Sequence, residues 1–167
     1  MQMDRFTTLA QQALASAQSL AMDHGHGELS PLHLLAALLA EREAVSRSIL
    51  TRAGVNADAV AEVVEKQMNH LPKVEGAGAR ITTAPALVEV LHDAEKRAKA
   101  LEDAYTSCEH LLIALAHVTS PAREVLSTLG IDAKRLEKAV KAIRAASGVQ
   151  SIQDPGAESS YEALKKY

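Results

Sequence analysis

The chain has very few aromatic residues and almost no cysteine. Aromatic residues make up 2% of its 167 residues, tryptophan is missing, and Cys108 is the sole cysteine. One cysteine excludes an internal disulfide and is compatible with a reducing cytoplasm, where we expect the protein to reside. Since 47% of the residues are apolar, the core must consist mainly of Ala, Leu, Val and Ile. This composition of good helix formers favours an all-α fold.

Charge and hydropathy exclude several further classes of protein. The formal net charge is −3 and no basic cluster is present, which argues against a nucleic-acid-binding surface. No apolar run approaches the roughly 18 residues that a membrane span requires, and the N-terminal segment lacks the apolar core of an export signal. None of the eight glycines precedes a lysine, so no phosphate-binding loop is predicted. We therefore expect a soluble chain without nucleic-acid, membrane or nucleotide ligands of its own.

An internal duplication is the most informative feature. The segment SPLHLLAALLA recurs 77 positions later as SCEHLLIALAH, and Leu14 and Leu91 are in register with it. After a one-residue deletion the offset becomes 76, so that Gly54 matches Gly130. Internal repeats of this kind indicate a duplicated structural unit.

The duplication sets the expected domain organisation. The predicted segments are a first repeat at 4–71, a linker loop at 72–82, a second repeat at 83–146 and a flexible connector at 147–167. Each repeat is expected to contain about four helices, because apolar residues recur at three- and four-residue spacing between helix-capping residues. The predicted fold class is all-α, with pseudo-twofold duplicated four-helix repeats forming one eight-helix globular domain.

The residues Cys108, Glu109 and His110 place a thiol, a carboxylate and an imidazole side by side. A nucleophilic site is disfavoured, because residues two apart do not face each other on a helix. A metal site could also draw on His117, but no paired metal-binding spacing is present. The favoured interpretation is a helix start with Ser107 as N-cap and His110 at the capping-box position. No catalytic residue and no metal ligand are predicted.

Several segments together resemble the N-terminal domain of the Hsp100/Clp family of AAA+ chaperones. They are MDRFTTLAQQALASAQSLAMDHGHGELSPLHLLAALL near the start, LPKVEG in the linker, the two HLL helix starts and ALKKY at the end. The resemblance covers essentially the whole chain. It implies a mobile, non-catalytic module tethered to a homo-hexameric ring. The ATPase modules of that ring bind ATP and magnesium and thread polypeptide through a central pore.

The resemblance also implies a function in recognition. Such a domain engages exposed apolar segments of unfolded or aggregated polypeptides and helps deliver them to the pore, together with the Hsp70 (DnaK) system. The isolated domain is expected to be a monomer. The polar surface positions that the family uses for client binding correspond to Thr7, Asp103 and Glu109, and candidate apolar groove walls are Leu14, Val88, Leu91 and Leu111.

Two alternative functions remain open. In ClpA- and ClpC-type relatives the domain docks adaptors or reads phosphoarginine, and both ClpC repeats begin a helix with Thr-Glu-His. Here Glu109 precedes His110, but Leu32 precedes His33, so one of the two carboxylates is missing. The other alternative is a free-standing helical scaffold or small enzyme, which the helix-like ALKKY ending disfavours.

Overall fold

The computed structural model describes residues 3–74, 80–148, 151–153 and 155–156. Within them a short 3-10 turn, Met3–Arg5, precedes eight α-helices and two short strands. The elements are α1 (Thr8–Asp23), β1 (Glu28–Leu29), α2 (Pro31–Leu38), α3 (Val45–Arg52), α4 (Ala57–Asn69), β2 (Thr82–Thr83), α5 (Pro85–Ala100), α6 (Cys108–His117), α7 (Pro121–Thr128) and α8 (Ala133–Ser147). The predicted fold class, two four-helix repeats in one eight-helix domain, is confirmed.

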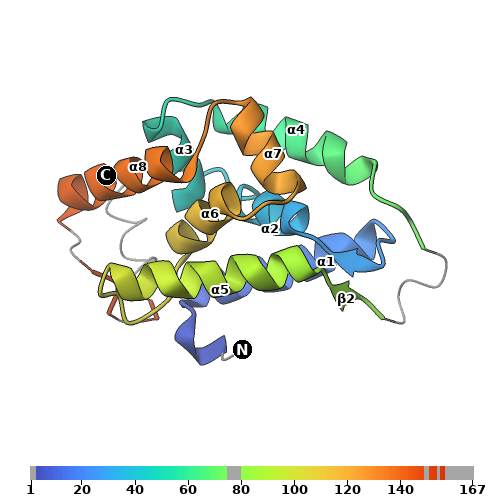
Figure 1. Cartoon of the computed structure of the whole chain (residues 1–167), viewed down its shortest axis with the longest axis horizontal. Helices are drawn as coiled ribbons and strands as arrows, with labels where there is room; N and C mark the ends of the chain where they lie inside the picture. The colour runs from blue at the N-terminus through green and yellow to red at the C-terminus, as the bar shows by residue number, and fades with distance from the viewer. Residues whose placement is uncertain (1–2, 75–79, 149–150, 154, 157–167) are drawn as a thin grey trace.

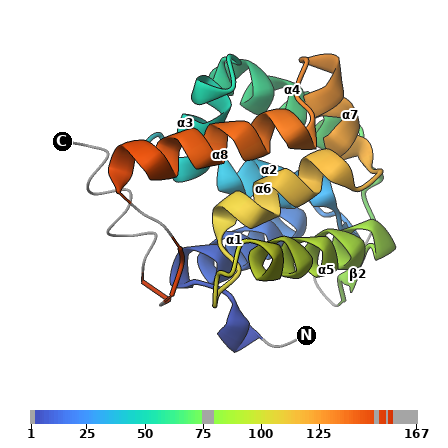
Figure 2. The ribbon, with the colours of Figure 1, turned by 60° about the vertical axis from the view of Figure 1, so that its left-hand side comes forward.

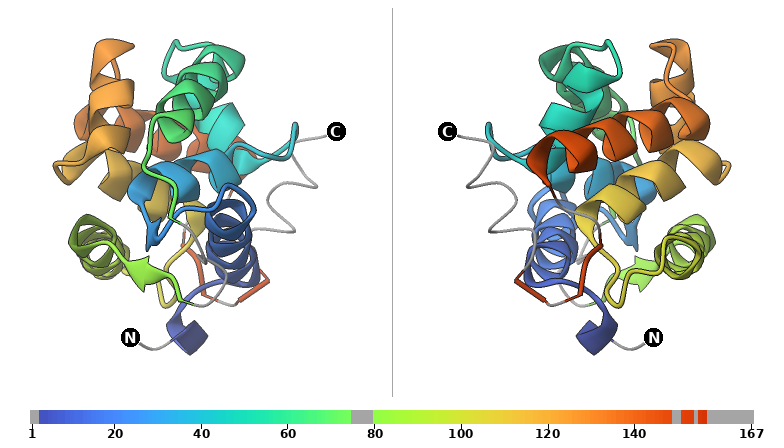
Figure 3. Two further views of the ribbon diagram at one scale, coloured as in Figure 1. Left: turned by 90° about the vertical axis from the view of Figure 1, so that its right-hand side faces the viewer. Right: turned by 90° about the vertical axis from the view of Figure 1, so that its left-hand side faces the viewer.

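The helices form three layers. Figures 1 and 3 show α1 and α5 on one side, α3, α4, α7 and α8 on the other, and α2 and α6 between them. The central pair packs against both outer layers: α2 contacts α1 and α4, and α6 contacts α5, α7 and α8. Each repeat thus contributes one helix to the centre and three to the outside.

The sequence explains why α2 and α6 occupy the centre. Nine of the ten residues of α6 and six of the eight residues of α2 are buried. A helix that is apolar on all sides is stable only when it is covered on all sides. The outer helices instead carry one buried face; in α8, for example, it comprises Leu136, Ala139, Val140, Ile143 and Arg144.

The two central helices begin with the predicted capping boxes. Ser30 and Ser107 are the N-caps, and each donates its backbone N–H to Nδ1 of the histidine three residues later, over 2.8 Å. His33 and His110 therefore take the place that Glu or Gln has in the usual capping box. The expectation that the doubled HLL segments are structural helix starts is confirmed.

Two backbone pairings cross between the repeats. Leu29 of β1 pairs with Thr83 of β2, and Phe6 pairs with Thr106. Phe6 and Thr83 are 77 positions apart, as are Leu29 and Thr106, so the two pairings are copies of each other. The sequence predicted only a loop for residues 72–82, because a strand of two residues leaves no periodic signal.

Part of the expected connector contacts the domain after α8. A flexible connector was expected from residue 147, but Ile152 is only 2% exposed and its carbonyl accepts the N–H of Ala104 over 2.8 Å. The carbonyl of Pro155 likewise accepts the N–H of Thr8 over 2.9 Å. We call residues 151–153, 155 and 156 the docked tail; in Figure 2 its short red segments lie beside one end of α1. Ser147 ends α8 and Gly148 is its C-cap, and the other residues of the expected connector lie outside the described part of the chain.

No described helix combines the length and the apolar character that a transmembrane helix needs.

Glu102, in the loop after α5, has an unfavourable backbone conformation. Glu102 has φ of 59°, whereas its counterpart in the first repeat, 77 positions earlier, is Gly25 with φ of 70°. A residue with a side chain in this left-handed region is destabilised by about 1 to 2 kcal/mol. Glycine avoids this strain, but its larger conformational entropy in the unfolded chain cancels part of the gain. We therefore expect Glu102→Gly to raise the free energy of unfolding by about 0.5 kcal/mol in urea titrations. Glu89→Gly, on the exposed side of α5, should instead lower it by about 1 kcal/mol.

Candidate functional site

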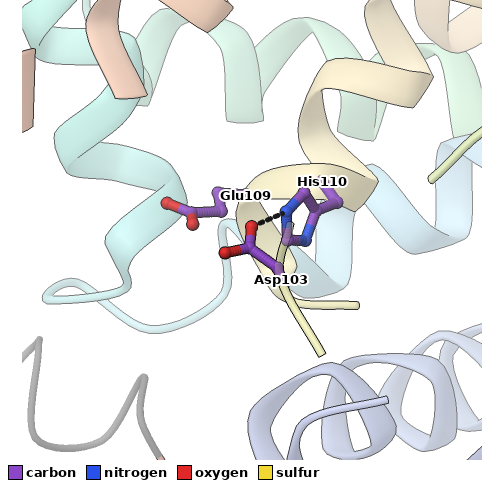
Figure 4. Close-up of side chains that lie close together, drawn as sticks. All are labelled: Asp103, Glu109 and His110. Carbon is purple, nitrogen blue, oxygen red and sulfur yellow. Dashed lines mark hydrogen bonds and ion pairs between the residues drawn. The ribbon is translucent and has the colours of Figure 1, made fainter. Parts of the chain in front are cut away.

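A buried charged cluster lies at the start of α6. It comprises Asp103 from the α5–α6 loop, Glu109 and His110 from the first turn of α6, and Arg144 from the last turn of α8. Figure 4 shows the Asp103 and His110 side chains facing each other, with Glu109 extending from the same turn of α6. We call these four residues the charged cluster.

Asp103 is the centre of the charged cluster, because both of its oxygens are fully used. Oδ2 accepts from His110 Nε2 over 2.7 Å and from Arg144 Nη2 over 2.8 Å. Oδ1 accepts from Arg144 Nη1 over 3.2 Å and from the N–H of Ile152 over 2.8 Å. An ionised carboxylate offers about four acceptor positions, and these contacts occupy all of them. Burial alone would raise the pKa of Asp103, but the hydrogen bonds from His110 and Arg144 hold it below its ordinary value.

Arg144 joins the two carboxylates. Its Nε donates to Glu109 Oε1 over 2.9 Å, its Nη2 also contacts that oxygen, and both Nη atoms donate to Asp103. Burial would lower the pKa of Arg144, but its contacts with Asp103 and Glu109 raise it instead. The guanidinium is therefore a permanent positive charge between two buried negative ones.

The charged cluster can be considered as a metal or catalytic site. Asp103, Glu109 and His110 offer ligand atoms within 4.8 Å of one another. The Arg144 guanidinium, however, already donates to both carboxylates, so the cation that those oxygens require is supplied by the protein. Cys108, the residue before Glu109, is buried. The arrangement fits a structural ion-pair network that fixes α5, α6, α8 and the docked tail to one another.

The first repeat has a different cluster at the matching place. The counterparts of Asp103, Glu109, His110 and Arg144 are His26, Leu32, His33 and Met68, at offsets of 77 and 76 positions. All four are buried, and His26 Nδ1 lies 2.8 Å from His33 Nε2, as Asp103 does from His110. We call this set the neutral cluster. The same fold position thus carries an ion-pair network in one repeat and two histidines with two apolar residues in the other.

Hydrogen bonding fixes the protons of the neutral cluster. His33 Nδ1 accepts the Ser30 N–H, so its proton is on Nε2 and is donated to His26 Nδ1. The proton of His26 must then be on Nε2, which is buried and has no partner among the described residues. Burial, followed by the neighbouring His26 and His24, lowers the pKa of His33 to about 4. Burial, followed by His24 and Lys73, lowers the pKa of His26 as well.

The predicted polar site residues lie in the interior. Thr7 caps α1, its Oγ1 accepting the Ala10 N–H over 3.2 Å, and Asp103 and Glu109 belong to the charged cluster. All three are buried. The expectation that they are surface groups was therefore wrong, because the second repeat covers Thr7 and Arg144 covers the carboxylates. Thr7 lies at the seam between the repeats, where its N–H donates to the Thr106 carbonyl over 2.9 Å. A role of these residues in binding stays a prediction.

The four predicted apolar residues differ in accessibility. Leu111 and Leu91 belong to the core, and Leu14 is partly buried against it. Leu111 therefore cannot form a groove wall without a rearrangement of α6. Val88, on α5, is 48% exposed and one turn from Leu91. Of the predicted apolar set, Val88 offers an accessible surface in this structure.

Sequence reasoning missed three residues of these sites, namely Arg144, His26 and Ile152. Arg144 follows Leu136 and Val140 at the spacing of the buried face of α8, where its counterpart is Met68. An arginine on an apolar helix face is a signal for a buried partner, and the signal was present in the sequence. His26 would have been found by applying the 77-residue offset to Asp103. Ile152 is one apolar residue in a polar segment and gave no signal.

The sequence of this chain is similar to those of known proteins. The Clp repeat N-terminal domain family matches residues 5–129. Chaperone protein ClpB of Rhodopseudomonas palustris is 36% identical over the whole of this chain, and that of Vibrio cholerae is 34% identical. The aligned region is 19% of either relative, so the chain spans about a fifth of the length of the curated relatives it matches.

Solved structures share the fold. The Hsp104 N-terminal domain from Candida albicans superposes with a TM-score of 0.78 at 22% identity, covering 91% of this chain and 97% of that domain. The ClpV N-domain in a structure described as its complex with VipB peptide has a TM-score of 0.66 at 25% identity, covering 81% and 84% of the two chains.

Proposed function

This chain belongs to the Clp repeat N-terminal domain family, and on that premise we propose that it is the client-recognition domain of a ClpB-type disaggregase. It binds exposed apolar segments of unfolded or aggregated polypeptides in the cytoplasm and helps deliver them to the pore of a hexameric, ATP- and magnesium-dependent ring. In this proposal the parent protein works with the Hsp70 system, and the domain itself is a monomeric binding module.

The observation that carries the proposal is the match of the whole chain to ClpB chaperones at 34–36% identity. Two further observations support it. A ClpV N-domain of the same fold has been solved in complex with a peptide, which supports peptide binding by this architecture. The buried ionisable groups are engaged with one another, which fits a binding module better than an enzyme.

Val88 provides the test of the client surface. It exposes 48% of its surface on α5 and is the most accessible of the predicted apolar residues. We expect Val88→Asp to weaken binding of a reduced, carboxymethylated α-lactalbumin chain by about five- to tenfold, because a carboxylate would face the apolar segment. Fluorescence anisotropy of the labelled polypeptide measures the Kd.

A second exposed valine provides the matched control. Val74, on the linker after α4, is 52% exposed, and Val74→Asp should leave the Kd within twofold of the parent value. Equal losses in both variants would show that net charge rather than the α5 surface controls binding. If the unsubstituted domain does not bind the unfolded polypeptide at millimolar concentration, the client-recognition proposal is refuted.

Adaptor docking is the second candidate function, and the peptide complex of the ClpV N-domain favours it. Phosphoarginine reading is disfavoured for this chain, because the Glu109 carboxylate that would accept a ligand guanidinium already accepts Arg144. The matching position in the first repeat is the buried Leu32. Phosphoarginine added at 1 mM should therefore leave the amide NMR resonances of both α2 and α6 unmoved, and shifts at Glu109 and His110 would contradict this.

A further inference from the structure

The docked tail is held in the way that a protein holds a bound peptide. The N–H of Ile152 donates to Asp103 Oδ1 and its carbonyl accepts from the Ala104 N–H, both over 2.8 Å. Further along, the Pro155 carbonyl accepts the Thr8 N–H over 2.9 Å. The side chain of Ile152 itself is buried. Main-chain hydrogen bonds thus accompany one buried apolar side chain.

The groups that hold the docked tail are well suited to an exchangeable ligand. The Thr8 N–H is in the first turn of α1, where backbone N–H groups have no partner within the helix. The Ala104 N–H lies on the irregular loop before α6. In the docked tail, the partners of both donors and of the Asp103 carboxylate are main-chain atoms. A site that binds main-chain groups and buries one apolar side chain accepts any extended polypeptide that carries a suitable apolar residue.

A comparison of the repeats indicates that the docked tail can leave. In the first repeat the linker docks at a similar place, since Lys73 pairs with His26 and the Val74 N–H donates to the Gly25 carbonyl over 2.9 Å. That linker is anchored on both sides, by α4 and by β2. The docked tail is anchored, within the described chain, by α8 alone. Its release therefore breaks the contacts of Ile152, Gln153 and Pro155 but no helix or strand.

We propose that the seam at Thr8, Asp103 and Ala104 is a docking site for an extended apolar segment of a client polypeptide, and that the chain's own tail occupies it until such a segment displaces it. The inference rests on the proposed function for the class of ligand and on the predicted client-binding position Asp103, and it adds the competitor, which is the chain's own tail. A hollow of about 390 Å³ continues beside this seam. It is lined in part by Arg5, Lys99 and Thr106 and gives a longer ligand room next to Asp103 and Ala104.

Displacement of the docked tail has two physical consequences. The first is that the affinity for client is reduced by the fraction of molecules whose site is already filled. The second is that client capture frees the chain from Gly148 onward. The eight residues from 149 to 156 add up to about 25 to 30 Å of reach when extended. Binding at the seam would therefore lengthen the connection between this domain and the chain that follows it.

The test uses Ile152→Ser in the full 167-residue chain, with labelled, reduced and carboxymethylated α-lactalbumin as the probe. If the tail occupies the site in about nine-tenths of the molecules, removing its apolar anchor should tighten the Kd by about tenfold. Val74→Ser, which removes an apolar side chain from the linker of the first repeat, is the matched control and should leave the Kd unchanged. Circular dichroism at 222 nm verifies that both variants keep their helices.

A second measurement needs no variant. When the parent protein is saturated with the polypeptide, the amide resonances of Ile152 and Gln153 should move to random-coil positions, while those of Thr8 and Ala104 stay protected from exchange. An unchanged Kd for Ile152→Ser, or an Ile152 amide that stays in place in the saturated protein, overturns the inference while client recognition stands. If neither the parent nor Ile152→Ser binds the polypeptide, the proposed function falls as well.

Discussion

Replacement of Arg144 by methionine is expected to lower the free energy of unfolding by about 3 to 5 kcal/mol. The guanidinium is buried and donates to Asp103 and Glu109, so its removal leaves two buried carboxylates without a countercharge. Loss of one partner of a buried ion pair costs this much because the other charge stays desolvated. Urea titration followed by circular dichroism measures the change.

The neutral cluster supplies a compensating design. Asp103→His and Glu109→Leu, added to Arg144→Met, would give the second repeat the residue types that stand at the same positions in the first. We expect this triple variant to regain most of the lost stability and to lie within about 2 kcal/mol of the parent, because no uncompensated charge remains buried. The exposed pair of Lys66 and Glu62 is the control, and Lys66→Met should change the free energy by less than about 0.5 kcal/mol. A triple variant less stable than Arg144→Met would show that the two repeats pack differently at this place.

Acidification is expected to destabilise the first repeat before the second. His33 has a folded-state pKa of about 4 against an ordinary value of 6.5, so the unfolded chain binds more protons between these values. Its contribution to stability is complete above pH 6.5 and is lost as the pH falls towards 4, which amounts to about 3 kcal/mol. The Coulombic effects of His26 and His24 on His33 act in the same direction, and Lys73 acts likewise on His26.

His33→Gln separates this contribution from the general acid sensitivity of the protein. A glutamine at this position can still accept the Ser30 N–H as in a capping box, but it does not titrate. Urea titrations at pH 7 and pH 4.5 should show a smaller loss of stability for His33→Gln than for the parent. Asp103 acts in the same direction but at lower pH: its lowered pKa keeps its contribution intact until the pH falls below the ordinary value of 3.8. Equal pH dependence of the variant and the parent would contradict the assignment to His33.

The fold was predictable because its signals are local. Ser30 before Pro31, and Gly54 before Val55 and Asn56, mark helix ends over a few residues, and the duplication repeats those marks. The eight helices follow from such signals and from apolar spacing. The pairings between repeats were not predictable in this way, because Phe6 and Thr106 are far apart in the chain and each forms a single bridge.

The candidate site was less predictable, for a physical reason. Polar residues near helix starts, such as Thr7 and Glu109, are exposed in most proteins, and their exposure here depends on distant segments. Arg144 reaches Glu109 across 35 residues and Asp103 across 41. The docked tail covers Asp103 with Ile152, which lies in a stretch of polar composition. Only the three-dimensional structure shows that these segments converge.

The crossed pairings of Phe6 with Thr106 and of Leu29 with Thr83 have a consequence for the origin of the domain. In each pairing a segment just before a first helix binds the loop before the central helix of the other repeat, and the relation is reciprocal. This is the geometry of an isologous contact, the kind that joins the two subunits of a twofold-symmetric dimer. The domain therefore has the architecture of a homodimer whose subunits became one polypeptide. A joined pair, unlike a homodimer, can carry different residues at matching places, and here one half has two histidines where the other has an ion-pair network.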